Sequence, residues 1–516
     1  MTMTWTRIIT AGLVAALGTT AAAQQSSSDE DVARRQLESG RSFMRQGNYT
    51  EALKDFRAVA ETHASSSVAD DALLEIARYY FEIAEDFPQA STAVDEILKK
   101  YATSNSAPDA YVMAGRLALA RSHQPADLDA AVANFDRVTR LFPSSGAVPN
   151  ALEKLGEASF FGGKLDDALS FLGRVESEYP TTPAAADAYL AESRVLVARG
   201  DATAAMEELQ QVRNRWPGSP QAATALAQTT VLYRLYVRAH GGAAYALAPD
   251  TVGPTKIENF VDLALTPKGA LYLATDSGVT AVQPADAPKP PSVTRPRALV
   301  VDASGSLGVL EQAMVHPAVG DGFSLPVMRN GVLEALNKAM SVGQLSNGDW
   351  IVADESDKFL QRYSKAGKYL NVFSTNRLSR FVVNASDEVA GFDRDQKAVT
   401  ILDVTGKAIG HIPYKGAGYE LQNPEDLAFD GFGHLYVLDH TAVAIFSPFA
   451  AAPDAAAPNA KPAAPSADRA SYHLLTLYAE SDKSPSAFHK ALGFAIDRAG
   501  TMYLYDDRAQ RILVYR

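Results

Sequence analysis

The chain has 516 residues, which is more than one hydrophobic core usually organises, so we expect two or more domains. Hydrophobic residues make up 47% and charged residues 21%, as in folded globular proteins rather than disordered ones. The formal net charge of −12, with no run of basic residues, argues against a nucleic-acid partner, and the lack of cysteine excludes disulfides, thiolate metal sites and cysteine nucleophiles.

Residues 1–23 have the pattern of a secretory signal peptide. Arg7 provides a positive charge, an apolar run follows at 8–18, and small residues lead up to Ala23. Because the apolar run is shorter than a membrane span, we expect cleavage after Ala23 rather than a retained anchor. No cysteine follows the cleavage point, so we expect no lipid anchor, and no later stretch is apolar enough to cross a membrane. The sequence therefore predicts an exported protein, periplasmic or secreted, with no stable membrane insertion and a disordered mature N-terminus at 24–29.

Residues 30–240 contain a repeat built from two helical segments. Three prolines recur 37 residues apart, and an alanine follows each of them eight positions later. They are Pro143, Pro180 and Pro217 with Ala151, Ala188 and Ala225, and two earlier units keep only the alanine, as Ala72 and Ala110. The second helical segment of each unit has a shared alanine of its own, at Ala52, Ala90, Ala131, Ala168 and Ala205. A period of 37–41 residues with two helices predicts an α-solenoid of about five helical hairpins plus a capping helix.

The first unit also carries a recognisable family pattern. The stretch "ESGRSFMRQGNYTEALKDF" matches the tetratricopeptide repeat at Gly40, Phe43, Gly47, Tyr49, Ala52 and Phe56. The aromatic-Pro-x-S/T-x-x-A punctuation between units resembles the longer-period version of this repeat. That version occurs in periplasmic repeat proteins, including outer-membrane assembly lipoproteins and the division-linked repeat protein of the Tol–Pal system. The resemblance covers about residues 30–240.

The resemblance implies a binding groove. In a tetratricopeptide solenoid the first helix of each hairpin lines a concave face, which typically receives an extended peptide or a helix. The candidate groove residues here are five aromatic side chains with two arginines as charged anchors: Tyr79, Tyr80, Tyr111, Phe160, Tyr189, Arg78 and Arg194. For any one of these aromatic residues, burial between repeats is the more common role.

Beyond residue 243 the pattern changes to short β-strands. The clearest unit, 424–439, has an apolar strand, a D-x-x-G turn, a second apolar strand and an aspartate, and 491–507 repeats it. Weaker copies surround Gly269, Gly305, Gly348 and Asp387. Six such units predict a six-bladed β-propeller over 243–516, interrupted by a flexible Ala/Pro-rich insertion at 451–470. The strand pattern resembles NHL-repeat propellers.

The last propeller unit supplies only three strands before the sequence ends at residue 516. We expect the segment 243–249 ("AAYALAP") to provide the missing outer strand and so to close the ring.

The propeller leaves an enzymatic alternative open, because some six-bladed propellers are lactonase-like hydrolases or lyases with a metal in the central channel. One layer of that channel should lie seven residues before each turn, where the sequence has Asp262, Ala298, Ser341, Arg380, Asp426 and Gly493. Two carboxylates and one arginine make a poor metal cage, and we expect the arginine to pair with an aspartate. We assign Asp262, Ser341, Arg380 and Asp426 to the channel mouth, and we expect no metal, no cofactor and no catalytic residue there.

The sequence therefore predicts a multidomain α and β protein that is not an enzyme. The expected function is that of an exported interaction scaffold of the cell envelope. It would bind a protein or peptide partner through the solenoid groove, with the propeller mouth as a second surface. Two alternatives stay open: a metal-dependent propeller enzyme of the lactonase or lyase type, and a glycan- or peptidoglycan-binding module.

Overall fold

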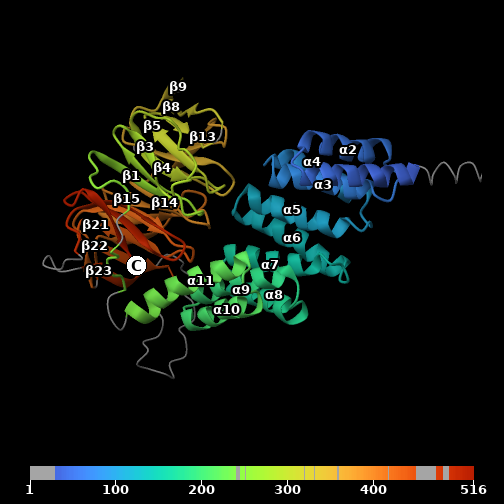
Figure 1. Cartoon of the computed structure of the whole chain (residues 1–516), viewed down its shortest axis with the longest axis horizontal. Coiled ribbons are helices and arrows are strands. Elements are labelled where there is room, and N and C mark those ends of the chain that lie inside the picture. The colour runs from blue at the N-terminus through green and yellow to red at the C-terminus, as the bar shows by residue number, and fades with distance from the viewer. Residues whose placement is uncertain are drawn as a thin grey trace, which may run out of the picture. The chain divides into compact units, whose positions relative to one another are not determined.

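The computed structural model describes residues 29–239, 244–249, 252–318, 320–329, 332–356, 359–416, 418–448, 472–479 and 487–516 (Figure 1). The expected signal peptide at 1–23 and the Ala/Pro-rich insertion at 451–470 lie outside these residues. Within the segment 24–29, which we expected to be disordered, Asp29 is helical. The described residues divide into two compact units, one formed by those within 29–119 and 129–155 and the other by those within 120–128 and 156–516.

The N-terminal half of the described chain is a series of helices. After the helical residues 29–45 come α2 (Tyr49–Thr62), α3 (Ala69–Glu82), α4 (Phe87–Lys100), α5 (Ala107–Arg121), α6 (Pro125–Leu141), α7 (Val148–Phe161), α8 (Leu165–Glu178), α9 (Pro183–Ala198), α10 (Ala202–Arg215), α11 (Pro220–Leu232) and the π-helix η1 (Tyr233–Arg238). The helices α6, α8 and α10 each end two residues before a punctuating proline, because proline cannot continue a helix. This arrangement confirms the predicted series of helical hairpins.

The second helix of each hairpin buries the same three positions. They are an alanine, a larger apolar residue four positions on and a valine or isoleucine seven positions on, all at most 1% exposed: Ala52, Phe56, Val59; Ala90, Val94, Ile97; Ala131, Phe135, Val138; Ala168, Leu172, Val175; and Ala205, Leu209, Val212. The first helix is shaped to receive the larger residue. A Cβ atom on Gly115 would lie 2.3 Å from Phe135, and one on Gly156 would lie 2.5 Å from Leu172. The hairpins therefore depend on small residues where their helices cross.

The C-terminal part is a ring of six antiparallel sheets, which we number as blades one to six. Blade one is β1 (Phe260–Leu265), β2 (Leu271–Thr275) and β3 (Gly278–Gln283); blade two is β4 (Pro296–Val301), β5 (Leu307–Glu311), β6 (Met314–His316) and β7 (Phe323–Ser324); blade three is β10 (Ala339–Gln344), β11 (Trp350–Asp354), β12 (Leu360–Tyr363) and β13 (Tyr369–Ser374). Blade four is β14 (Leu378–Val383), β15 (Val389–Asp393), β16 (Ala398–Leu402) and β17 (Ala408–Pro413); blade five is β20 (Pro424–Phe429), β21 (Leu435–Asp439), β22 (Ala442–Ser447) and β23 (His473–Ala479); blade six is β24 (Ala491–Ile496), β25 (Met502–Asp506) and β26 (Arg511–Tyr515). Two hairpins, β8 (Pro326–Arg329) with β9 (Val332–Ala335) and β18 (Lys415–Gly416) with β19 (Tyr419–Glu420), lie between blades.

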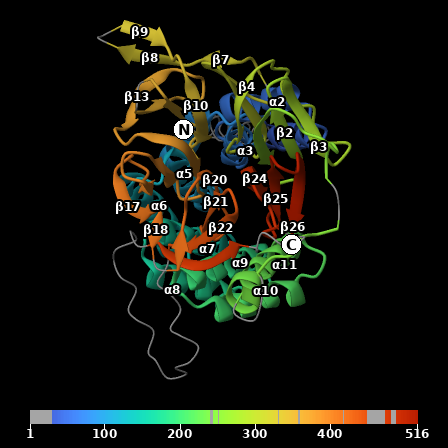
Figure 2. The ribbon, with the colours of Figure 1, turned by 90° about the vertical axis from the view of Figure 1, so that its left-hand side faces the viewer.

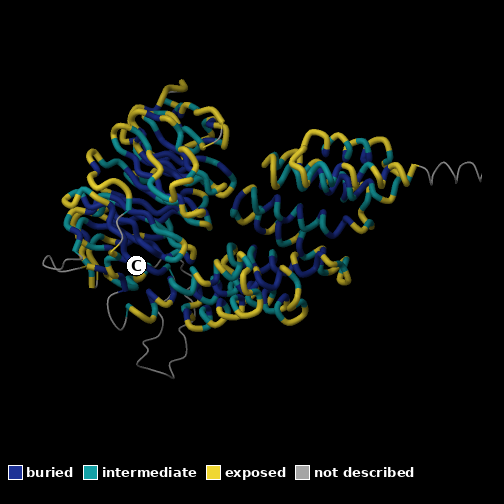
Figure 3. Tube along the Cα trace, in the orientation of Figure 1, coloured by how far each residue is buried: buried dark blue, intermediate teal, exposed yellow. Residues whose placement is uncertain are grey.

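The ring is closed around the first strand of each blade. Each first strand contacts the first strands of the two neighbouring blades, and contact between β1 and β24 completes the circle. In Figure 2 the first strands β4, β10, β20 and β24 lie near the centre, whereas the outer strands β3, β13 and β17 lie at the rim. Buried residues occur in all six blades, and in Figure 3 dark blue segments fill much of the interior of the propeller. The structure thus confirms the six-bladed propeller.

The repeated turns explain why these sequences form blades. The turn glycines have positive φ, and in blade four Asp387 takes the glycine position with φ of 62°. The aspartate six residues after the turn caps the sheet, as expected. For example, the Asp439 carboxylate accepts hydrogen bonds from the backbone N–H groups of Gln422 at 2.9 Å and Asn423 at 2.7 Å.

The expected closing strand is present in the described residues 244–249. The N–H of Ala246 donates to the carbonyl of Arg516 at 2.9 Å, and the N–H of Arg516 donates back to the carbonyl of Ala246 at 2.9 Å. The N–H of Ala248 donates to Val514 at 2.8 Å. Tyr245 is buried within the same core as blade six. A segment that precedes the propeller in the sequence therefore completes its last blade.

The second compact unit joins the last solenoid helices to blades five and six through one hydrophobic core. Val231 and Leu235 of α11 and η1 belong to the same buried cluster as Tyr245, Tyr436 and Phe488 of the propeller. The boundary between the compact units therefore falls within the helical part of the chain, and the end of the solenoid belongs with the propeller.

A buried polar cluster accompanies this core. His434, which is fully buried, lies 2.8 Å from the Tyr236 hydroxyl through Nε2 and 2.7 Å from the Asp430 carboxylate through Nδ1. Arg234 donates to the carbonyl of Ala499 at 2.9 Å. Burial raises the pKa of Tyr236, so its hydroxyl stays protonated. These contacts fix η1 to the propeller.

Candidate functional site

Three of the predicted groove residues gather in the first compact unit, on α3. The Tyr79 ring lies 5.6 Å from the Tyr49 ring and 5.2 Å from the Tyr80 ring, and the Tyr80 hydroxyl accepts a hydrogen bond from Arg57 at 2.5 Å. We call Tyr49, Tyr79 and Tyr80 the tyrosine cluster. Tyr49 is exposed and was not among the predicted groove residues, although it is one of the positions that match the repeat. Tyr49 lies two residues after the turn glycine Gly47, and this position in the repeat gives no indication of binding.

The predicted anchor Arg78 lies beside the tyrosine cluster and connects two repeats. Its guanidinium is 3.7 Å from Glu75 on the same helix and 3.9 Å from Asp109 on α5. Burial raises the pKa of Asp109, and the nearby charge of Arg78 opposes that rise. About 42% of the Arg78 side chain is exposed, so it remains accessible to a ligand.

The other groove candidates are held mainly by packing. The Arg137 guanidinium lies 5.6 Å above the Tyr111 ring, whose second neighbour is Phe142 at 6.2 Å. In the second compact unit, the predicted anchor Arg194 lies 5.9 Å above the Phe160 ring. These are cation–π contacts between helices, and they stabilise the repeat stack.

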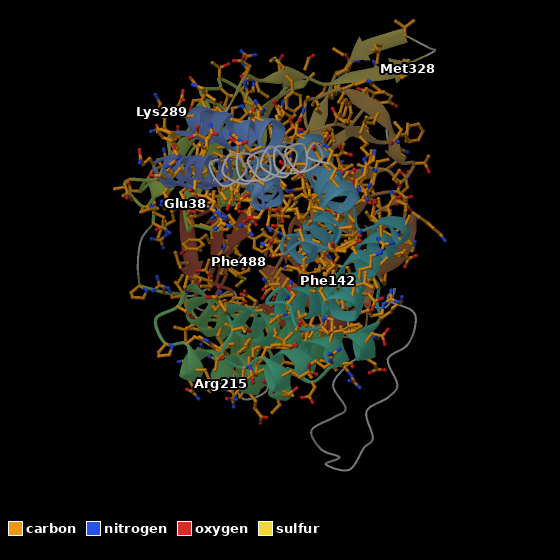
Figure 4. The ribbon with its side chains drawn as sticks, turned by 90° about the vertical axis from the view of Figure 1, so that its right-hand side faces the viewer. Glu38, Phe142, Arg215, Lys289, Met328 and Phe488 are labelled. Carbon is orange, nitrogen blue, oxygen red and sulfur yellow. The ribbon has the colours of Figure 1, made fainter. Side chains whose placement is uncertain are left out.

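Tyr189 is placed in the core rather than at a free surface. Its side chain is only 5% exposed, and its ring lies 5.9 Å from that of Trp216 and 5.1 Å from the Arg215 guanidinium, which Figure 4 labels. The more common role of a repeat-helix aromatic, packing between repeats, is therefore the one this structure gives to Tyr189.

Tyr189 also neighbours three glutamates that sequence analysis did not identify. Glu176 of α8, Glu192 of α9 and Glu208 of α10 come together although no short motif links them. Burial, reinforced by the other two carboxylates, raises the pKa of Glu176 to about 9, and burial also raises the pKa of Glu192 and of Glu208. The Glu176 carboxyl group in the second unit therefore keeps its proton at neutral pH.

The predicted channel residues form an ion network in the propeller. Arg380 of blade four bonds to Asp426 of blade five through Nε at 2.5 Å and to Asp262 of blade one through Nη2 at 2.5 Å. Blade four stands opposite blade one in a ring of six, so the Arg380 side chain crosses the central channel. The expected pairing of the arginine with an aspartate is confirmed.

The same layer also connects neighbouring blades. The Asp262 carboxylate accepts the N–H of Leu299 in the next blade at 2.8 Å, and the Asp426 carboxylate accepts the N–H of Phe494 at 3.0 Å. Ser341 accepts the N–H of the next blade in the same way, at 3.3 Å from Phe381. Asp262, Ser341 and Asp426 are all at most 5% exposed, so the structure places them inside the ring. Their oxygen atoms are used to hold blades together.

The charges in this layer neutralise one another. Burial raises the pKa of Asp426 to about 6, against the opposing effect of Arg380. Burial acts to lower the pKa of Arg380, but the charges of Asp262 and Asp426 outweigh it and hold that pKa above its usual value. Among the described residues, no group of three or more His, Asp or Glu side chains is arranged to hold a metal ion. The arrangement suits a structural ion network better than acid–base chemistry.

The rim at this end of the propeller carries polar and charged pairs that sequence analysis missed. In each pair, one residue lies near the start of the first strand of a blade and the other just after the end of the second. They are Asn259 with Asp276, Lys338 with Glu355, Arg377 with Asp395, Glu425 with His440, and Lys490 with Asp507, at 2.6 to 3.5 Å. The signal was available, because most of the second members stand seven residues after the turn anchor. This rim presents both signs of charge.

Comparison with known families supports the fold of the solenoid. Residues 30–160 match the family described as outer membrane lipoprotein YfiO, and residues 150–182 match a tetratricopeptide-repeat family. A search of curated proteins finds no significant match. The chain therefore combines tetratricopeptide-type repeats with a six-bladed β-propeller, and its repeats resemble those of an envelope protein family.

Similar solved structures share about 10% sequence identity with this chain. A protein of unknown function from Bacteroides thetaiotaomicron gives a TM-score of 0.37, with 52% of this chain and 75% of that chain covered. Streptogramin B lyase gives 0.32, with coverage of 53% and 97%. A tetratricopeptide repeat protein from Parabacteroides merdae gives 0.31, with coverage of 39% and 73%.

Within the described part of the chain, no helix combines the length and the apolar character that crossing a bilayer requires.

Proposed function

We propose that this protein is an interaction scaffold of the cell envelope that binds a protein partner through the first helices of its solenoid. The observation that carries the proposal is the partly exposed tyrosine cluster with Arg78 beside it, within repeats that match an envelope family. Tyrosine and arginine are the residues most often found at the energetic centre of protein interfaces. The envelope location and the signal peptide are part of this proposal.

The chemistry of the cluster indicates what binds. Three tyrosine rings offer flat apolar surface with hydroxyl groups at their edges, and Arg78 supplies a positive charge that Glu75 and Asp109 only partly offset. We therefore expect a peptide segment with an apolar or aromatic anchor and a carboxylate nearby. The mixed charges of the propeller rim fit a second, weaker contact surface.

The enzymatic alternative has less support from the described channel. An active site there would need free carboxylates, but Asp262 and Asp426 are engaged by Arg380 and by backbone N–H groups of neighbouring blades. Binding of glycan or peptidoglycan has no specific observation in its favour.

The proposal is tested by affinity isolation from envelope extract. The full chain, the double variant Arg78→Glu/Tyr79→Ser and the control Lys100→Glu are used as bait. Lys100 is an exposed basic residue on α4, a second helix, so its replacement changes charge without touching the cluster. We expect one stoichiometric protein partner with the unaltered chain and the control, and its loss with the double variant. Equal recovery by all three baits would refute the assignment of the cluster.

A further inference from the structure

The last helix of the solenoid lacks a covering that earlier first helices have. Each first helix has one recurring alanine, which we call the register alanine: Ala72, Ala110, Ala151, Ala188 and Ala225. The residue directly after it is Leu73 in α3, Leu152 in α7 and Tyr189 in α9, and these side chains are 4%, 0% and 5% exposed. The equivalent Tyr111 in α5 is half-buried. The equivalent residue of α11 is Leu226, which is 51% exposed although the alanine before it is fully buried. Helix α11 therefore buries its register alanine like the other first helices, but the side of the helix that carries Leu226 is exposed.

The open side continues along the helix. Tyr233 is 54% exposed and Val237 is 44% exposed, and with Leu226 they stand at helical spacing of seven and four residues. The opposite side of α11 and η1 is fully packed, because Val231, Leu232 and Leu235 are at most 2% exposed in the core shared with the propeller. We call Leu226, Thr230, Tyr233 and Val237 the open face.

In the other hairpins this face is covered by the second helix of the same hairpin. The residue five positions after the register alanine is Gly115 in α5 and Gly156 in α7, and each lies against the second helix of its own hairpin. In α11 that residue is Thr230. No second helix follows, because only residues 240–243 separate the described helical end from the strand segment 244–249 that pairs with β26. The open face is therefore half of an unfinished hairpin.

The finished hairpins show what fits. Each second helix presents a buried alanine, a larger apolar residue at +4 and a valine or isoleucine at +7. Phenylalanine stands at +4 only where the first helix has Gly40 or Gly115. Where the first helix has Gly156, Ala77 or Ser193, the +4 residue is leucine or valine. Because phenylalanine occurs only opposite glycine and Thr230 is larger than glycine, we expect valine or leucine at +4.

We propose that the open face of α11 and η1 binds an amphipathic helix of a partner protein with the spacing Ala-x3-(Val/Leu)-x2-(Val/Ile), which completes the sixth hairpin. The Ala/Pro-rich sequence 451–470 does not supply this spacing, because it contains no valine, leucine or isoleucine. A second copy of α11 fits less well, because two open faces offer no alanine that lets helices approach closely. This surface is separate from the tyrosine cluster.

The probe is a peptide with the sequence of α10, 202–215, because its hairpin pairs a leucine with Ser193, the residue closest in size to Thr230. Isolated helices of 14 residues are marginal in water, so the peptide carries a side-chain staple on its polar face and a fluorescent label. Fluorescence anisotropy measures its binding to the full chain. The matched peptide contains Leu209→Asp. The protein variants are Leu226→Asp and the control Leu141→Asp, which replaces a 61% exposed leucine on α6.

We expect saturable binding of the α10 peptide to the unaltered chain and to Leu141→Asp, with affinity lowered about tenfold or more by either Leu226→Asp or the change in the peptide. Equal binding by both peptides, or by Leu226→Asp and the unaltered chain, would overturn the proposal. Sedimentation velocity tests the competing occupant: a concentration-dependent dimer that disappears in Leu226→Asp would assign the face to a second copy instead. Because the tyrosine-cluster variants leave α11 intact, failure here is distinguishable from failure of the proposed function.

Discussion

Replacing Arg380 should destabilise the propeller far more than replacing an arginine three residues away. Arg380→Met keeps much of the side-chain volume but leaves Asp262 and Asp426, which are 3% and 2% exposed, without their cation. Removing one partner of a buried ion pair costs about 3–5 kcal/mol. Because the Arg380 side chain is itself 27% exposed, we expect about 3 kcal/mol, a fall in Tm of about 6–12 °C for a domain of this size. Arg377→Met removes an exposed pair with Asp395 and should cost at most about 1 kcal/mol.

The penalty should also depend on pH. The pKa of Asp426 is about 6 in the folded protein and 3.8 as an isolated group, so the folded state retains a proton that the unfolded chain releases. Folding stability from this group therefore falls as the pH rises through that interval and then levels off. Without Arg380 the folded pKa rises further, so the loss continues above pH 6, at about 1.4 kcal/mol per pH unit until the new pKa is reached.

Urea unfolding followed by tryptophan fluorescence and circular dichroism at pH 5 and pH 8 measures both effects. We expect Arg380→Met to be closer to the unaltered protein at pH 5 than at pH 8. Adding Asp262→Asn and Asp426→Asn to the same chain should remove the pH dependence and recover part of the stability. The ion network does not hold the ring together as argued if Arg380→Met and Arg377→Met unfold at the same urea concentration. The same conclusion follows if Arg380→Met loses the same free energy of unfolding at both pH values.

Three further predictions concern the rest of the second unit. Gly156→Ala should destabilise this unit by about 1–3 kcal/mol, because the new Cβ would lie 2.5 Å from Leu172. The control Gly173→Ala, whose Cβ would have nothing within 4 Å, should be neutral or stabilising by up to about 1 kcal/mol in the same urea titration. Equal effects of the two substitutions would contradict the steric argument. Glu176→Gln should stabilise the protein by about 1 kcal/mol at pH 8, after discounting for its partial exposure, and should have little effect at pH 4.5. The reason is that the pKa of about 9 lets the folded state keep a proton that the unfolded chain releases as the pH rises above 4.5. An effect of the same size at both pH values would refute this explanation. Replacing residues 244–249 by a Gly/Ser segment of equal length should lower the melting temperature of the whole propeller, since blade six loses its outer strand, and an unchanged transition in calorimetry would show that the strand is dispensable.

The features that sequence analysis predicted are those that recur. Ala168 and Ala205 mark fully buried helix crossings because every hairpin needs a small residue there. The turn glycines and the aspartates six residues on recur in the blades for the same kind of reason. The pairing of Arg380 could also be predicted by aligning the six blade units. The aligned layer contains one arginine and two aspartates, and the favourable arrangement is an ion pair between them.

The features that sequence analysis missed depend on contacts between distant residues that do not repeat. Tyr236 meets His434 across 198 positions, and no periodicity connects them. The three glutamates beside Tyr189 likewise come from three different helices that no short motif links. The openness of Leu226 shows the opposite case: its sequence matches its buried counterparts, and only the absence of a following helix exposes it.

Site-specific photo-crosslinking in the envelope tests the central claim, that the solenoid binds a protein partner, most directly. A photoreactive phenylalanine analogue replaces Tyr79 in one chain and Leu141 in another, since both positions lie on solenoid helices but only Tyr79 belongs to the tyrosine cluster. We predict one defined protein adduct from position 79, absent from position 141 and lost when Arg78→Glu is added. The absence of any adduct at position 79, or the same adducts from both positions, would contradict the account.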